Sequence, residues 1–144
     1  MIIKKFFYLF LLVFALNAQE KEYIINTVAF YNVENLFDTV DDPENNWDEA
    51  RTPNGEDKWT DEKYEIKLNN LSKVLPQIGS DISNSHPAII GLCEVENKKV
   101  LIDLISTKSM KPLNYGIIHF DSPDWRGIDV ALLFDTEKFI PRIT

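Results

Sequence analysis

A short apolar run near the middle of the chain constrains its fold more than any other feature. Residues 88–95 (AIIGLCEV) are apolar up to Cys93, and Glu94 ends the apolar stretch. A strand that is apolar at successive positions is typical of a sheet whose two faces are both covered, as in α/β proteins. We therefore predict a buried strand over 88–95, covered on both faces.

Three further segments have the composition of strands. Residues 23–33 (YIINTVAFYNV) are rich in β-branched and aromatic residues and contain no interior breaker, so we predict a second buried strand there. Residues 115–120 and 128–134 predict two more strands, joined by a polar turn segment over 121–127.

Two amphipathic helices are predicted between these strands. The first begins at Thr60, carries Asp61 and Glu62 in its first turn, and should end near Pro76, which lacks a backbone donor. Its apolar residues recur every three or four positions and share one face: Tyr64, Leu68, Leu71, Leu75 and Ile78. Asn97 is expected to cap the second helix. The order of strand, helix, strand, helix, strand and strand is that of an α/β fold.

Residues 1–18 have the composition of a secretory signal peptide. Two lysines precede an apolar run over 6–16, and small and polar residues follow it. About eleven apolar residues give a helix of roughly 16 Å, against a hydrocarbon core of about 30 Å, so we expect no stable membrane anchor. Cleavage is expected after Ala18 or Gln19, which would leave a secreted or periplasmic protein that begins near residue 19.

The charge of the chain and its single cysteine exclude several classes of protein. Fifteen Lys and Arg against 23 Asp and Glu give a net charge of −8, which argues against a protein whose own charge gathers duplex DNA. A phosphate ligand would need a bound cation or a local basic group. Cys93 is the only cysteine, so no internal disulfide can form, and its apolar neighbours favour a small buried hydrophobe over a nucleophile.

Residues 38–57 predict a long acidic loop between the first strand and the first helix. The segment has little apolar periodicity and contains turn signals at Pro43, Pro53 and Asn54-Gly55. Loops of this length are uncommon in compact domains and often functional, for example as lids or rims, and a solvated excursion is the alternative.

Polar residues lie at the ends of three predicted strands. They are Asn32 and Glu34, then Glu94 and Glu96, then Arg126 with Asp129. Ligands of open α/β sheets collect beyond strand ends, so we expect these places to face one cleft. Carboxylate and carboxamide oxygens suit Mg²⁺ better than Zn²⁺, and an arginine fork could hold a phosphate. The alternatives are ordinary: Asn32 as a turn former, Glu94 as an acid near a helix, and Arg126 in a surface ion pair.

Three segments resemble the first three signature blocks of the endonuclease/exonuclease/phosphatase superfamily, which has a deoxyribonuclease I-like fold. They are residues 28–38 (VAFYNVENLFD), 87–97 (PAIIGLCEVEN) and 126–133 (RGIDVALL), and they look most like those of exported bacterial members. The resemblance implies an α/β sandwich. It also implies that residues 19–144 are the N-terminal, incomplete part of the domain, a mixed sheet with flanking helices.

The resemblance also implies a set of site residues. Glu94 matches the glutamate that binds the divalent cation, Mg²⁺ or else Mn²⁺ or Ca²⁺, and Asn32 matches the asparagine that helps order the metal or the phosphate. Arg126 is a candidate phosphate contact, so Asn32, Glu94 and Arg126 are the expected catalytic set. Glu96 and Asn97 belong to a variant spelling of the second block. The implied function is hydrolysis of phosphodiester bonds, with nucleic acid or nucleotides as partners.

Two later blocks of the family, which supply its general base, have no counterpart in this sequence. The two histidines lie elsewhere: His86 in a loop before a proline, and His119 at a strand end that could face the cleft. We therefore expect this chain, as given, to be inactive and poorly soluble, because half a sandwich exposes an apolar sheet face. The alternatives are a secreted module whose acidic loop binds Ca²⁺, and a pseudoenzyme that binds phosphate without cleaving it.

Overall fold

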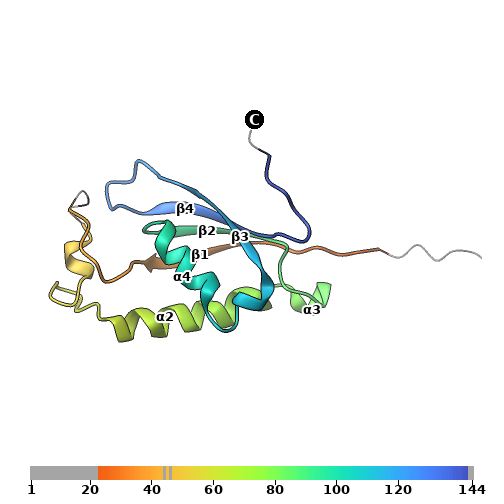
Figure 1. Ribbon diagram of the computed structural model, residues 1–144, viewed down its shortest axis with the longest axis horizontal. Coiled ribbons are helices and arrows are strands. Elements are labelled where there is room, and N and C mark those ends of the chain that lie inside the picture. The colour runs from red at the N-terminus through yellow and green to blue at the C-terminus, as the bar shows by residue number, and fades with distance from the viewer. Residues whose placement is uncertain (1–22, 44, 46, 143–144) are drawn as a thin grey trace, which may run out of the picture.

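A computed structural model describes residues 23–43, 45 and 47–142, and the predicted signal peptide lies outside this part of the chain. The described residues form a mixed sheet with helices on one face (Figure 1). This arrangement confirms the predicted α/β class. Within the described ranges, none of the helices has the length and apolar character that a membrane crossing requires.

The sheet has four strands in the order β1-β2-β4-β3. Their bounds are β1 (Val28–Leu36), β2 (Ile89–Val95), β3 (Tyr115–Phe120) and β4 (Asp129–Asp135). Strands β1 and β2 are parallel, whereas β4 runs antiparallel to both of its neighbours. Because β1 and β2 are parallel, both end at the same edge of the sheet, and the predicted site residues Asn32 and Glu94 come together there.

The helices form a single layer. The α-helices are α2 (Asp61–Val74), α3 (Ser80–Ser83) and α4 (Lys98–Ser106), and the short 3-10 turns are η1 (Glu49–Arg51), η2 (Leu75–Gln77) and η3 (Lys111–Leu113). Both long helices begin where the sequence predicts, because the Thr60 side chain accepts a hydrogen bond from Lys63 N and the Asn97 side chain accepts one from Val100 N. Helix α2 ends at Val74, next to Pro76, as expected.

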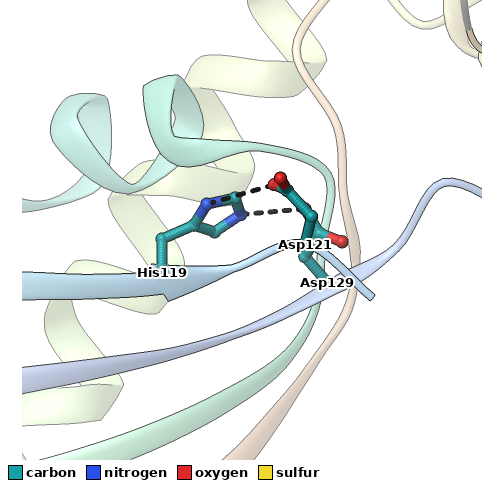
Figure 2. Close-up of side chains that lie close together, drawn as sticks. All are labelled: His119, Asp121 and Asp129. Atoms are coloured by element: carbon teal, nitrogen blue, oxygen red, sulfur yellow. Dashed lines mark hydrogen bonds and ion pairs between the residues drawn. The ribbon is translucent and has the colours of Figure 1, made fainter. Parts of the chain in front are cut away.

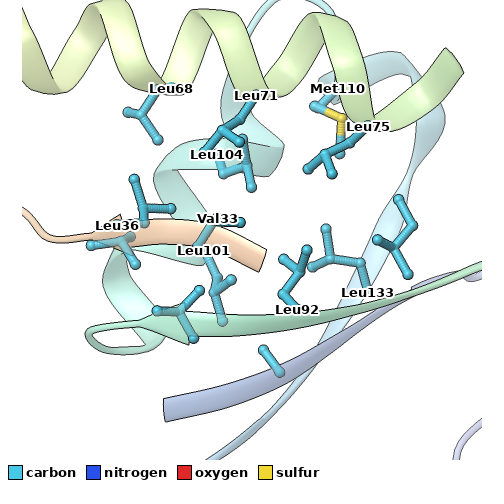
Figure 3. Packing of buried hydrophobic residues seen from close by; sticks show 14 of the residues in the cluster. Val33, Leu36, Leu68, Leu71, Leu75, Leu92, Leu101, Leu104, Met110 and Leu133 are labelled. Carbon is cyan, nitrogen blue, oxygen red and sulfur yellow. The ribbon is translucent and has the colours of Figure 1, made fainter. Parts of the chain in front are cut away.

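The hydrophobic core lies between these helices and one face of the sheet (Figure 3). The predicted apolar stripe of α2 faces inward, and Leu68, Leu71 and Leu75 point toward the sheet. Residues from every strand and from α4 complete the core, among them Val33, Leu36, Leu92, Leu101, Leu104, Tyr115 and Leu133. This packing buries Val33, Leu36 and Val95 at the ends of β1 and β2, next to the predicted site residues.

The first predicted strand was misplaced. It was expected over 23–33, but β1 covers Val28–Leu36, and Tyr23 and Ile24 are exposed. Strand propensity cannot reveal where a partner begins. Val28 pairs with Ile89, the first residue of β2, so residues upstream of Val28 have no neighbouring strand.

Among the described residues, helices cover only one face of the sheet (Figure 1), which corrects the expectations that 88–95 is covered on both faces and that 23–33 is a buried strand. Burial alternates along β1, and Val28 and Phe30 on the open face are 69% and 74% exposed. Cys93 lies on the same face and is partly exposed rather than buried. The Phe30 ring crosses the face directly over Gly91, where a Cβ atom would collide with it.

Candidate functional site

The predicted site residues lie at the edge of the sheet where β1 and β2 end. The backbone is unusual there, because Glu34, Asn35 and Glu94 have φ values of 56°, 61° and 63°. The left-handed region is rarely adopted by residues other than glycine and persists where the surrounding structure holds it. The pairing of β2 with β4 shifts between Cys93 and Val95, so Glu94 lies in a bulge. A bulge breaks the alternation of a strand and redirects a side chain.

Glu94 and Arg126 line one cavity of about 240 Å³ at this edge. The cavity is bounded by the bulge of β2, by the start of β4 and by the loop between β3 and β4. Cys93 and Val130, which pair across the sheet on its open face, form part of the lining. Two of the three predicted catalytic residues therefore share one cavity, although their chemical roles stay predictions.

Asn32 lies next to this cavity but does not line it. It pairs in register with Cys93, the residue before Glu94. Its side-chain oxygen accepts a hydrogen bond of 2.6 Å from the backbone N–H of Glu34, which fixes the turn after the strand. Asn32 instead lines a second cavity between β1 and helix α2. The structure thus places the amide beside the Glu94 cavity while it acts locally as a turn former.

Arg126 is held by a neighbour in its own loop. Its Nε and Nη2 donate to the two carboxylate oxygens of Asp124 at 3.0 and 2.8 Å. This pairing lowers the pKa of Asp124 to about 2 and raises the pKa of Arg126. The guanidinium is therefore oriented beside Glu94. Its Nη1 group makes no hydrogen bond to the residues that the structure describes, which leaves a donor for a ligand.

A larger cavity of about 540 Å³ adjoins the first, and Asp129 lines both. It is strongly acidic, with five carboxylates in its wall: Asp42, Glu96, Asp121, Asp124 and Asp129. The indole rings of Trp47 and Trp125 meet edge to face at its rim, 4.4 Å apart. The long acidic loop thus contacts the loop that carries Arg126, so it forms a rim rather than a solvated excursion.

Glu96 is the most perturbed carboxyl group of this acidic cavity. It is buried, and its Oε2 accepts a hydrogen bond of 2.7 Å from the backbone N–H of Asp38. Burial, together with the nearby carboxylates Asp38, Asp48 and Asp42, raises the pKa of Glu96 to about 7. The hydrogen bond from Asp38 N opposes this shift only in part. Glu96 therefore fastens the acidic loop to the end of β2.

His119, Asp121 and Asp129 form a cluster whose potential ligand atoms all lie within 4.8 Å of one another (Figure 2). His119 Nε2 lies 2.8 Å from Asp129 Oδ2, and Nδ1 lies 3.7 Å from Asp121 Oδ1. The other oxygen of Asp129 accepts a hydrogen bond from Ser122 N, which fixes the carboxylate. His119 faces the helix side of the sheet, since it pairs in register with the buried Ala131.

Sequence reasoning missed two contacts at this end of the molecule. The pairing of His119 with Asp129 was not predicted, although both lie on the hairpin formed by β3 and β4. His119 pairs in register with Ala131, and Asp129 lies two residues before Ala131 on the same face of the sheet. That spacing was an available signal. The contact of Glu96 with Asp38 spans 58 residues, and no local pattern in the sequence indicates it. His86 lies in a loop, as expected, 3.3 Å from Asp135 at the opposite end of the sheet.

Comparison with known proteins identifies a family. The model of a family described as Endonuclease/Exonuclease/phosphatase matches residues 27–143, which include all three signature segments and every candidate site residue named above. Searches of the curated proteins and of the solved structures found no match to this chain.

Proposed function

The chain belongs to the endonuclease/exonuclease/phosphatase family, and we propose that it is an exported, divalent-metal-dependent hydrolase of phosphodiester bonds. The family places the chain among hydrolases of the phosphodiesterase and nuclease type. The proposal goes further in naming Mg²⁺ as the ion, with Mn²⁺ or Ca²⁺ as substitutes. It also names nucleic acid or nucleotides as the substrate class and the periplasm or the exterior as the location.

The observation that carries this proposal is the shared cavity of Glu94 and Arg126. A carboxylate on a strained bulge and a preoriented guanidinium lie together at the end of a parallel strand pair. Strand ends of this kind are where ligands of open α/β sheets bind. An anionic group in the cavity would meet the guanidinium of Arg126, and a cation would meet the carboxylate of Glu94, with Asp124 and Asp129 also in the wall.

The donor atoms near the bulge suit a hard divalent cation. The Glu94 carboxylate offers an oxygen ligand from the bulge of β2. Asn32 lies on the neighbouring strand β1, opposite Cys93, the residue before Glu94. Mg²⁺ is bound in proteins through one or two carboxylates and keeps several waters, so a sparse set of this kind is adequate. When bound, the ion would supply Lewis-acid stabilisation of charge on the phosphoryl oxygens.

The chain's own residues have separable tasks in this proposal. Arg126 binds a phosphoryl oxygen through Nη1, while Asp124 holds the guanidinium plane. Glu94 binds the cation and Asn32 holds the turn that positions the end of β1. Preorganised groups of this kind lose little free energy to reorientation when the substrate binds.

The test is hydrolysis of bis(4-nitrophenyl) phosphate, in the presence of Mg²⁺, by a protein that carries this chain together with the two later family blocks that supply the general base. Glu94→Gln keeps the shape of the side chain and removes its charge, and we expect a loss of activity of at least about a hundredfold. Glu65→Gln, an exposed position on α2, is the matched control. Equal activity in the two variants would contradict the assignment of Glu94.

A cation-binding module without hydrolysis is the second candidate, and a specific observation favours it. Asp48 is 1% exposed, and its Oδ1 has no hydrogen-bond partner among the described residues. Its Oδ2 accepts from Asp42 N, next to the acidic cavity. A thermal shift with Ca²⁺ that is lost in Asp48→Asn, together with no hydrolysis under any metal, would favour this candidate over the enzyme.

A further inference from the structure

A continuous groove runs along the free edge of β1, on the far side of Asn32 from the Arg126 cavity. It consists of two adjoining cavities of about 430 and 380 Å³ between the end of β1 and helix α2. Four residues line both cavities and join them: Glu34, Trp59, Lys63 and Lys67. Because β1 is an edge strand, no further strand covers this groove within the described residues.

The groove has a positive excess in a chain whose net charge is −8. Arg51, Lys63 and Lys67 line it, against the two acids Glu34 and Asp57. The acidic cavity on the other side of the site has five carboxylates in its wall. The two sides of the strand ends therefore differ in sign, and an anion approaching the site is favoured from the α2 side.

The cationic side chains of the groove are positioned by contacts that leave donors for a ligand. Lys67 Nζ donates to the carbonyl of Glu34 at 2.5 Å and lies 5.9 Å from the centre of the Trp59 ring. Lys63 Nζ donates to the carbonyl of Asp57 at 3.0 Å. Each ammonium group has three donors and uses one of them in these bonds. Trp59 is itself fixed, since its Nε1 donates to Phe37 O at 3.0 Å.

The groove connects electrostatically with the predicted site. Burial lowers the pKa of Lys67, and the carboxylates of Glu34 and Glu94 counteract this effect, so Lys67 lies within the field of Glu94. Arg126 on the opposite side also lies in that field. Glu94 lines the Arg126 cavity, and Asn32, which pairs in register with the residue before Glu94, lines the groove where it approaches the site.

We propose that this groove is a phosphate subsite, in which Lys63 and Lys67 bind a second phosphate of an oligonucleotide substrate next to the phosphodiester at the Glu94 site. The inference rests on the proposed function for the identity of the substrate. Arg51 extends the subsite toward the acidic loop, where its Nε pairs with Asp57 Oδ2 at 3.0 Å. The subsite would favour a substrate with neighbouring phosphates over an isolated phosphodiester.

The test measures binding without chemistry. The probes are two thymidine dinucleotides labelled with fluorescein at the 3′ end, one with and one without a 5′-phosphate. Fluorescence anisotropy at low salt and in EDTA gives the affinity of the full chain for each probe. We expect the 5′-phosphate to strengthen binding about tenfold, as expected for one charge-assisted contact.

Variants of opposite expected effect keep the test informative. The double substitution Lys63→Gln and Lys67→Gln should reduce the advantage of the 5′-phosphate to about onefold. The control is Lys73→Gln, at an exposed position in the last turn of the same helix and outside the groove. It removes one positive charge, against two in the double variant, and should leave the advantage of the 5′-phosphate intact. Glu34→Gln removes a negative charge from both cavities and should increase the advantage. A variant that merely unfolds cannot produce such a gain.

The outcomes separate this inference from the proposed function. A 5′-phosphate advantage that depends on Lys63 and Lys67 supports the subsite, even if no metal gives hydrolysis and the proposed function fails. An advantage unchanged in the double variant, or absent in the wild type, overturns the subsite while leaving Glu94-dependent hydrolysis standing. An advantage that Glu34→Gln does not increase also contradicts it.

Discussion

Glu94 and Glu96 lie two positions apart but in opposite surroundings. Glu94 faces a cavity that also contains the guanidinium of Arg126, whereas Glu96 is buried beside Asp38 and near Asp48. The sequence shows only two acids after an apolar run. The positive φ of Glu94 and the burial of Glu96 arise from the bulge and from the returning acidic loop, both of which depend on partners distant in the sequence.

The buried Glu96 makes stability depend on pH, and the direction is determined by the sign of its shift. Its pKa is raised from 4.5 to about 7 in the folded chain. The folded state therefore keeps a proton that the unfolded state has lost, and the stability from this group decreases as pH rises from about 4.5 to about 7. The change amounts to at most about 3 kcal/mol.

We predict that Glu96→Gln stabilises the chain at pH 8 and flattens this part of the pH dependence. The glutamine oxygen can still accept the hydrogen bond from Asp38 N, and no charge is buried. Urea unfolding at pH 5, 6, 7 and 8 measures the effect, with the exposed Glu137→Gln as the control. If the wild type and Glu96→Gln had parallel pH profiles, the Glu96 carboxyl would not titrate in this range.

At the scale of elements, the sequence predicted the helices better than the strands. The stripe of α2 and the cap residues Thr60 and Asn97 depend on local spacing and local hydrogen bonds, and these predictions are confirmed. The start of β1 depends on where β2 begins, because Val28 pairs with Ile89, which lies 61 residues later in the sequence. Burial depends on whether anything covers a face, which strand composition does not reveal.

The same difference applies to the candidate site. That Asn32, Glu94 and Arg126 meet at one end of the sheet could be predicted from strand ends and from the family resemblance. That Asn32 lines the α2 side while Arg126 lines the other follows from the edge position of β1, which only the sheet order reveals. The basic groove was missed because its residues come from β1, η1, α2 and the segment before α2, with no shared motif.

The cap of α4 provides a test at this scale, since the helix begins directly after the segment of Glu94 and Glu96. Asn97 Oδ1 accepts from Val100 N at 3.1 Å. Replacing Asn97 by Ala leaves that donor unpaired and should lower the free energy of unfolding by about 1 kcal/mol. Asn97→Ser keeps an acceptor and should be nearly neutral. Urea midpoints at unchanged m-value measure both, and an equal loss in the two variants would show that the capping hydrogen bond is not its cause.

At the scale of the whole molecule, the described residues form one layer of helices on one sheet (Figure 1) and leave most of the second, apolar face of the sheet open. Rows of residues cross this face in register, for example Phe30, Gly91, Leu132 and Ile118. Val28, Phe120 and Val130 on the same face are also exposed. Phe139 and Ile140 cover part of this face, where they line a small cavity together with Ile89, Ile118, Leu132 and Phe134. Contiguous apolar patches of this kind mark interaction surfaces or cause association.

We therefore predict that the chain associates through the open face. Replacing both Val28 and Phe30 by Thr keeps strand propensity and removes two highly exposed apolar side chains, so the monomer fraction should rise several-fold at a given concentration. Sedimentation velocity across a range of concentrations measures that fraction.

Ile82→Thr on α3 is the control, because this isolated residue is 66% exposed and lies away from the sheet. Single exposed apolar residues are ordinary in soluble proteins, so this control should not change the distribution. If Ile82→Thr increased the monomer fraction as much as the double substitution, association would reflect general surface hydrophobicity rather than the open face.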